Sequence, residues 1–312
     1  MSVAHTVLER DALRRSAVEQ REFERREVAA HYEHDPDIFS LVLDSQLTYS
    51  TGIFLHPEED LETAQTRKFA HVRELLRLKP GDKVFDAGCG WGSILLNLAQ
   101  HTGAEVHGIT LSAKQREVAL KRARERGIAD RVRIDVTHVG EVGLAPESVD
   151  AIVFSGSIVH MHDREGIHGW AARCLKPGGR LFISDCYFPA EARGSRESDA
   201  TEYILGRALG YCRLTTLSDE LALIEKSGLD LRFVEDLTSS YVHTVRHWIN
   251  NIRRNRRRLE ELAPGFAHLL QTYMTIGRHS FLKRTALEYM VLATKPVGDT
   301  DLADWSIAGL TR

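Results

Sequence analysis

The sequence has few cysteines and no dominant sign of charge, and both shortages narrow its possible functions. Its 312 residues include four cysteines, Cys89, Cys174, Cys186 and Cys212, and none of them forms a C-x-x-C pair. Disulfide-rich secreted scaffolds do not have this pattern, so we expect reduced thiols in a cytoplasmic protein without a metal site. The 41 basic and 44 acidic residues leave a net charge of −3, which carries no overall signature of nucleic-acid binding.

The N-terminus lacks a long apolar run. Residues 1–15 mix charged with small apolar residues, and they contain no continuous apolar segment of the signal-peptide kind. We therefore expect neither export nor stable membrane insertion. One basic run, residues 253–258, precedes Glu260 and Glu261 and is typical of a solvated helix face, although a phosphate-binding role stays open.

Apolar segments alternate with helical ones from residue 83 onward. Strands are expected at 83–87, 105–109, 131–136, 148–154, 180–184 and 286–295, and helices at 60–78, 92–102, 113–127 and 164–174. This alternation is typical of a doubly wound, mainly parallel α/β sheet. Residues 7–31 favour one or two amphipathic helices, and residues 203–281 favour a mainly helical insertion. We expect an N-terminal helical cap (1–64), a cofactor-binding core (65–200), a helical acceptor-binding lid (201–282), and the last strand with the tail (283–312).

A glycine-rich loop follows the first of these strands. The stretch Asp86–Gly92 has the order D-x-G-x-G-x-G, which lets the backbone turn sharply and approach a ligand. Alone, it also fits a dinucleotide site or a tight turn. With the acidic stretch 147–150 before the fourth strand and Leu-Lys-Pro-Gly-Gly at 175–179 before the fifth, it resembles the class I S-adenosylmethionine (SAM)-dependent methyltransferases over about residues 65–190. A nicotinamide-binding protein is the alternative.

Further stretches narrow this resemblance. The segments at 31–32, 47–50, 89–92, 108–112 with Gln115, and 241–248 resemble those of the cyclopropane fatty acid and mycolic acid synthases. The resemblance implies a seven-stranded Rossmann-like sheet with N-terminal helices and a helical lid, and SAM as cofactor. It implies that Tyr32 and Ser50 cover the methionine end of SAM, that Gly88 and Gly90 line it, and that Thr110 and Gln115 approach the ribose and adenine. The full expected cofactor set is Tyr32, Tyr49, Ser50, Asp86, Gly88, Cys89, Gly90, Thr110, Leu111, Gln115, His138 and Ser155.

His138 follows the third strand, where many methyltransferases carry an Asp that faces the adenine amino group. A neutral imidazole can accept that hydrogen bond. A solvent-facing loop position explains His138 equally well.

The chain departs from the synthases at the acceptor site. By the resemblance, the synthases hold a bicarbonate ion with a Cys, a Glu, a His and a Tyr. Here the first three positions carry Thr51, Val159 and Ser184, and only Tyr241 is retained. Ring closure by bicarbonate is therefore not expected. The Tyr241 hydroxyl is expected to point into the acceptor pocket.

Candidate bases for methyl transfer are few. His160, at the end of the fourth strand, and Asp185, at the end of the fifth, are expected at the edges of the cleft as catalytic residues. Alternatively, His160 packs against the cofactor loop and Asp185 caps a turn. Tyr187, Glu202, Tyr203 and Tyr211 either shape an aromatic pocket or serve helix packing.

These observations favour a methyltransferase that acts on a carbon atom of a hydrophobic small molecule in bacterial specialised metabolism. An indole alkaloid or prenyl acceptor is expected, by analogy with the teleocidin-type C-methyltransferases. An O- or N-methyltransferase, a divergent lipid cyclopropane synthase, and a SAM-binding regulator are the alternatives. A homo-oligomer is expected, with the hypothesis that its subunits exchange the N-terminal 30 residues, because an amphipathic segment must bury its apolar face.

Overall fold

The computed structural model describes residues 15–192 and 211–298. Its centre is a seven-stranded sheet with the order β3-β2-β1-β4-β5-β7-β6. The strands are β1 (Lys83–Ala87), β2 (Glu105–Thr110), β3 (Val132–Val136), β4 (Val149–Ser155), β5 (Leu175–Tyr187), β6 (Asp230–Asp236) and β7 (Leu287–Thr294). The α-helices are α2 (Ala17–Tyr32), α3 (Pro36–Val42), α4 (Leu61–Leu76), α5 (Ser93–Thr102), α6 (Ala113–Glu125), α7 (Arg164–Cys174), α9 (Leu217–Lys226), α10 (Thr238–Arg254), α11 (Arg256–Leu262) and α12 (Phe266–Leu282). Short 3-10 helices lie at Ala129–Arg131, Val139–Glu141, Ile158–His160 and Ala190–Ala192.

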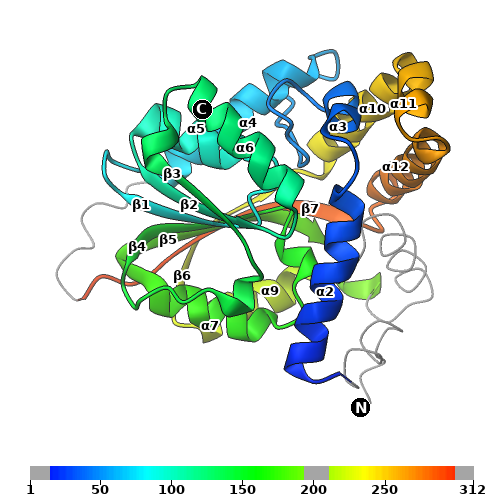
Figure 1. The fold of residues 1–312 in the computed structure, drawn as a ribbon. Helices are drawn as coiled ribbons and strands as arrows, with labels where there is room; N and C mark the ends of the chain where they lie inside the picture. Colours follow the sequence, from blue (N-terminus) through cyan, green and yellow to red (C-terminus); the bar gives the residue numbers. More distant parts are fainter. Residues whose placement is uncertain (1–14, 193–210, 299–312) are drawn as a thin grey trace.

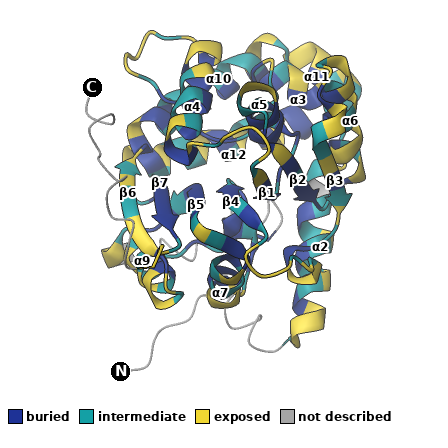
Figure 2. Ribbon diagram, turned by 90° about the vertical axis from the view of Figure 1, so that its left-hand side faces the viewer, coloured by how far each residue is buried: buried dark blue, intermediate teal, exposed yellow. Residues whose placement is uncertain are grey.

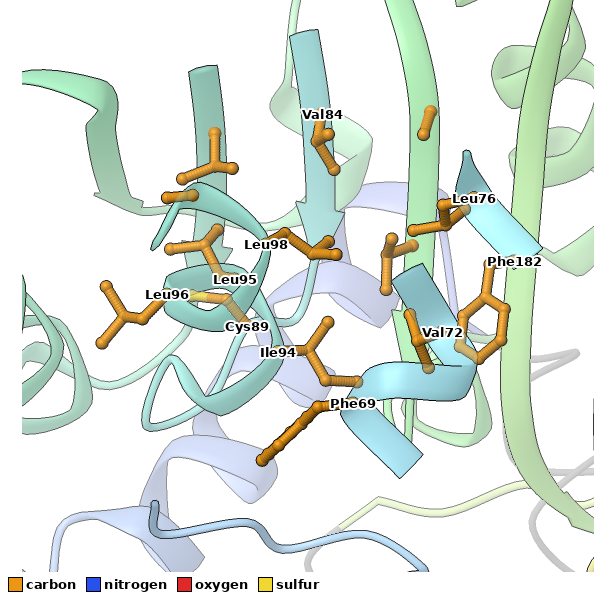
Figure 3. Close-up of a cluster of buried hydrophobic side chains, with 14 of the residues drawn as sticks. Phe69, Val72, Leu76, Val84, Cys89, Ile94, Leu95, Leu96, Leu98 and Phe182 are labelled. Carbon is orange, nitrogen blue, oxygen red and sulfur yellow. The ribbon is translucent and has the colours of Figure 1, made fainter. Parts of the chain in front are cut away.

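Helices cover both faces of the sheet (Figure 1). On β1, Val84 belongs to the apolar cluster under α4 and α5, while the next residue, Phe85, belongs to the cluster under α7 and α9. This follows from the alternation of side chains along a strand that is buried on both faces. Figure 2 shows the resulting layers, with buried strands between helices whose outer faces are exposed. Figure 3 shows the first cluster, in which Phe69, Val72 and Leu76 of α4 face α5 and the sheet.

The order of the strands places a binding site. Strands β1 and β4 are neighbours and parallel, and the chain continues to β2 on one side and to β5 on the other. Ligands of such sheets bind outside the carboxyl ends of the strands at this switch in order. The loop after Ala87 and the end of β4 at Ser155 both lie there.

A helical cap stands over this end of the sheet. Helices α3, α10, α11 and α12 share one apolar cluster, which includes Phe39, Trp91 and Trp248. Trp91 comes from the glycine-rich loop, and its ring lies 4.8 Å from that of Phe39. The cap therefore packs directly on the loop that the sequence identifies as the cofactor site.

Helix α2 also crosses this end of the molecule (Figure 1). Ser16 begins the helix with a capping box to Glu19. Glu24 is buried and accepts hydrogen bonds from the backbone N–H of His162 and from the His138 ring. Residues 17–32 thus find buried partners within their own chain. Exchange between subunits stays a prediction, and residues 1–14 lie outside the described part.

The region 201–282, expected to be mainly helical, also contains a strand. Strand β6 lies within it and pairs antiparallel with β7, and α9 precedes this strand. The strand was missed because it is an edge strand rich in charge, with Leu231 and Val234 both 37% exposed. From this region, α10, α11 and α12 belong to the cap, and residues 201–210 lie outside the described part.

The remaining predicted elements agree with the structure within a few residues, except that β5 begins at Leu175 instead of residue 180, because Leu175 already pairs with Val149. Over the ranges 15–192 and 211–298, no helix combines the length and the apolar character needed to span a membrane.

Candidate active site

Two adjoining cavities lie under the helical cap. One, of about 910 Å³, surrounds the glycine-rich loop, and we name it the cofactor pocket. The second, of about 990 Å³, lies between the carboxyl ends of β4 and β5 and helices α10 and α12, and we name it the acceptor pocket. They share five lining residues: Tyr32, Tyr49, Ser50, Gly156 and His160.

The structure brings together every residue predicted to bind the cofactor. The lining of the cofactor pocket includes Tyr32, Tyr49, Ser50, Asp86, Gly88, Cys89, Gly90, Thr110, Leu111, Gln115, His138 and Ser155. These residues come from six separate parts of the chain. Their convergence gives geometric support to the predicted set.

The glycine-rich loop is held by the neighbouring strand. The backbone N–H groups of Gly88 and Cys89 both donate to the Ile109 carbonyl, at 3.2 and 2.8 Å. Gly88 has φ +108°, and an added Cβ would lie 2.5 Å from Cβ of Ser157. Both its backbone angle and its surroundings therefore require glycine.

Asp86 is a buried acid whose Oδ1 has no hydrogen-bond partner in the described part of the chain. Its side chain is 3% exposed, and no hydrogen bond to Oδ1 is found among the described residues. Burial raises its pKa to about 7. A buried acid at the end of β1 needs a cationic or N–H partner. The amino group of a bound SAM methionine would provide one, so the residues present fit this cofactor.

Thr110 and Gln115 form a fixed pair on the opposite side of the pocket. The Thr110 hydroxyl donates to Gln115 Oε1 at 2.5 Å and accepts from the Ser112 backbone N–H at 3.2 Å. A Cβ added at Gly90 would lie 3.9 Å from Gln115 Nε2, which places this amide group across from the loop. Gln115 thus turns an amide donor toward the loop, on the wall of the cofactor pocket.

His138 does not face solvent. It is 7% exposed, its Nδ1 accepts from the Gly140 N–H at 3.1 Å, and its Nε2 lies 2.8 Å from the Glu24 carboxylate. Both ring nitrogens are therefore engaged, which leaves no nitrogen free to accept a hydrogen bond from adenine. The ring forms part of the wall of the cofactor pocket, held there by α2.

His160 stands where the two pockets meet. Its Nδ1 lies 2.6 Å from the carbonyl oxygen of Tyr211, so Nδ1 carries the proton and Nε2 is the basic nitrogen. Burial lowers the pKa of His160, which keeps the ring neutral at pH 7. No hydrogen bond to Nε2 occurs among the described residues. His160 has the tautomer and protonation state of a general base.

Asp185 lies beside the pocket but is already engaged. Its side chain is 2% exposed and accepts from the backbone N–H groups of Val159, at 3.3 Å, and Cys186, at 2.8 Å. Burial raises its pKa to about 6, against the opposing effect of Arg164. Asp185 holds the backbone next to His160, as a turn cap would, and it also lines the acceptor pocket.

Tyr241 lines the acceptor pocket, and the direction of its hydroxyl stays a prediction. Its ring packs edge-on against Phe281 at 4.6 Å and Trp248 at 6.0 Å. Tyr187 does not line either pocket, and its ring packs against Tyr289 in the sheet. The Tyr211 hydroxyl lies 3.2 Å from Nδ1 of His162. Glu202 and Tyr203 lie outside the described residues.

The three positions that depart from the synthases also lie here. Thr51 and Val159 line the acceptor pocket, and Ser184 lies behind it, where its hydroxyl donates to Glu288.

The sequence analysis missed two buried charged residues, Lys68 and Glu288. Each interrupts an otherwise buried apolar face, Lys68 on α4 and Glu288 on β7, and that interruption was the available signal.

Comparison with known proteins gives the family. A model of the mycolic acid cyclopropane synthetase family matches residues 19–289. Methyltransferase GfsG of Streptomyces halstedii is 34% identical over 221 residues, which are 68% of this chain and 76% of GfsG. A probable fatty acid methyltransferase of Pseudomonas putida is 28% identical over 281 residues, which are 87% of this chain and 70% of that protein.

A solved structure shares the fold. Mycolic acid cyclopropane synthase CmaA1, in complex with S-adenosylhomocysteine (SAH) and CTAB, superposes with a TM-score of 0.81 at 21% identity, over 87% of this chain and 98% of CmaA1. The predicted fold class and cofactor are confirmed. The chain belongs to the mycolic acid cyclopropane synthetase family and is a SAM-dependent methyltransferase.

Proposed function

We propose that this enzyme transfers the methyl group to a carbon atom of a hydrophobic small molecule held in the acceptor pocket. The observation that carries this proposal is the pocket wall, which combines the aromatic rings of Tyr32, Tyr49, Tyr241, Trp248 and Tyr273 with a neutral His160 at the border of the cofactor pocket. An indole or a prenyl double bond in specialised metabolism is the acceptor class that we propose.

SAM supplies an electrophilic methyl group when it is bound. An electron-rich carbon needs no prior deprotonation, and the role of the protein is to align it and exclude water. Aromatic faces attract the positive charge that develops on such an acceptor, by about 0.5 to 2 kcal/mol per ring. Tyr49 and Trp248 pack edge-on at 5.2 Å, which fixes two of these rings.

His160 then receives the proton that the methylated carbon loses. Its Nε2 is unprotonated because Nδ1–H donates to Tyr211. Asp185 keeps this segment in place through the Val159 N–H. With Val159 and Ser184 in place of a Glu and a His, the pocket lacks the groups that held bicarbonate in the synthases, which supports an open methylated product.

A hydroxyl acceptor is the second candidate, and the same tautomer of His160 favours it. A hydroxyl must lose its proton during transfer, and a neutral imidazole is a suitable base for that step. In this case His160 is essential for the methyl transfer itself, whereas a carbon acceptor requires it only afterwards.

Product analysis tests the proposal. The purified enzyme is incubated with methyl-labelled SAM and indole, prenyl, phenolic and unsaturated-lipid acceptors, and the product mass and label position are read. A methyl group on carbon supports the proposal. Label on oxygen or nitrogen overturns it in favour of the second candidate, and a cyclopropane product shows that the missing bicarbonate ligands are not needed.

A further inference from the structure

Glu288 is a buried acid that the proposed reaction does not use. It lies on β7, opposite Cys186 of β5, and is 3% exposed. Its carboxyl group accepts from the Ser184 hydroxyl and from the Cys186 thiol, both at 3.1 Å. It lines the acceptor pocket but not the cofactor pocket. Glu288 therefore faces the acceptor.

No cationic side chain pairs with this acid in the part of the chain that the structure describes. Lys68 exerts an attraction from a distance, but its Nζ donates to Ser50. Asp185, the neighbouring acid, adds repulsion, while Cys186 and Ser184 favour the charged form through their hydrogen bonds. Burial dominates and raises the pKa of Glu288 to about 8. The pocket thus holds an acid without a counter-charge.

The surroundings of the pocket suit a cation. Tyr49, Tyr241, Trp248 and Tyr273 line it together with Glu288. Aromatic faces beside a carboxylate are a general arrangement for binding an ammonium group. A neutral hydroxyl gains less here, because it brings no positive charge to offset the negative charge of a buried carboxylate. Asp185 is a weaker partner, because the nearby Arg164 already attracts its negative charge.

We propose that the acceptor carries a basic amine, and that Glu288 binds its ammonium group within the aromatic pocket. This inference rests on the proposed function, because it names the class of acceptor for the same site. The amine is a recognition group and is distinct from the carbon that is methylated. Binding converts Glu288 to the carboxylate, and its proton passes to the solvent.

Calorimetric titration of the enzyme–SAH complex at pH 7 tests this pairing with octylammonium, 1-octanol and octanoate as probes. We expect octylammonium to bind about tenfold more tightly than 1-octanol, which corresponds to about 1.4 kcal/mol. Titrations in two buffers with different ionisation enthalpies should show proton release for the ammonium probe only. Glu288→Gln should abolish both the preference and the release. Glu105→Gln, at the exposed start of β2, should change neither.

Equal or weaker binding of octylammonium overturns the inference, as does a Glu288→Gln variant that keeps the preference. If that variant does not fold, the wild-type preference and proton release decide alone. If the enzyme methylates a neutral carbon acceptor but does not bind octylammonium more tightly than 1-octanol, only this inference is contradicted. If it binds octylammonium more tightly but methylates no carbon, the proposed function is contradicted instead.

Discussion

Nζ of Lys68 lies 2.9 Å from Oγ of Ser50, and neither side chain is exposed by more than 8%. Gln65 holds the same residue from its other side, because Nε2 donates to the Ser50 carbonyl at 2.9 Å. Ser50 lines both pockets. Helix α4 therefore positions a residue at the place where cofactor and acceptor meet.

Replacement of Lys68 by Met should impair catalysis more than folding. Without its donor, Ser50 loses its fixed orientation, and we expect kcat/KM for SAM to fall about tenfold, the loss expected for one well-formed hydrogen bond. Removal of a buried amine costs little stability when an apolar side chain fills the space. Steady-state kinetics and denaturant unfolding measure both effects. Lys121→Met, on the exposed face of α6, is the control, and unchanged kinetics in Lys68→Met would contradict the positioning role.

Lys68 should also affect stability as a function of pH. Burial lowers its folded pKa from 10.5 to about 7. Between these values the unfolded chain binds the additional proton, so this group increases stability as pH rises from about 7 toward 10.5. The difference in unfolding free energy between wild type and Lys68→Met should therefore shift in favour of wild type over that window. A constant difference would show that Lys68 is not neutral in the folded protein.

His160→Asn should reduce turnover by about 10² to 10⁴, the range for loss of a general base, with SAH affinity unchanged. In wild type the neutral ring is the active form, and burial lowers its pKa. The rate should therefore rise with pH to a plateau, with a midpoint below 6.5, and the variant should lack this rise. His268→Asn, at an exposed position of α12, is the matched control. If the rate of His160→Asn still rises with pH at the same midpoint, His160 is not the general base.

Gly88→Ala and Gly81→Ala separate backbone strain from close packing. Both glycines have positive φ, but only at Gly88 would the added Cβ collide, with Ser157 at 2.5 Å, whereas Gly81 has no atom within 4 Å. Gly81→Ala should lose about 1 kcal/mol of stability and keep its SAM affinity. Gly88→Ala should also bind SAM at least about tenfold more weakly, because the loop must move. Calorimetry with SAM and SAH distinguishes the two, and equal affinities would contradict the steric argument.

Glu220→Gln should destabilise the packing of α9 against α7. Glu220 is fully buried and binds Arg164 at 2.5 Å and His168 at 2.8 Å. Burial alone would raise its pKa, but Arg164 and His168 lower it. The Glu220 carboxylate therefore contributes fully to folding stability above pH 4.5, and this contribution is lost as pH falls below that value. The variant leaves Arg164 uncompensated, at a cost of about 3 to 5 kcal/mol in urea unfolding. Glu165→Gln breaks an exposed pair with Lys226 and should cost less than about 1 kcal/mol, and equal losses would argue against a buried ion pair.

Local sequence patterns were sufficient to predict much of the fold. Strand β1 and the Asp86–Gly92 loop were predictable because an apolar run followed by spaced glycines constrains the backbone over a few residues. Strand β6 was not predictable, because an edge strand such as Asp230–Asp236 needs only one partner, β7, and tolerates charge on its exposed face.

The sequence by itself determined the family, the sheet and the set of residues that line the cofactor pocket, since these follow from short motifs whose backbone geometry is local. Only the tertiary structure decided what each polar group does. His138 gives its ring nitrogens to Glu24 and Gly140, and His160 owes its tautomer to the Tyr211 carbonyl, 51 residues away. Glu288 enters the acceptor pocket through pairing of β7 with β5. Such roles depend on partners distant in the chain, and burial then sets which groups carry charge.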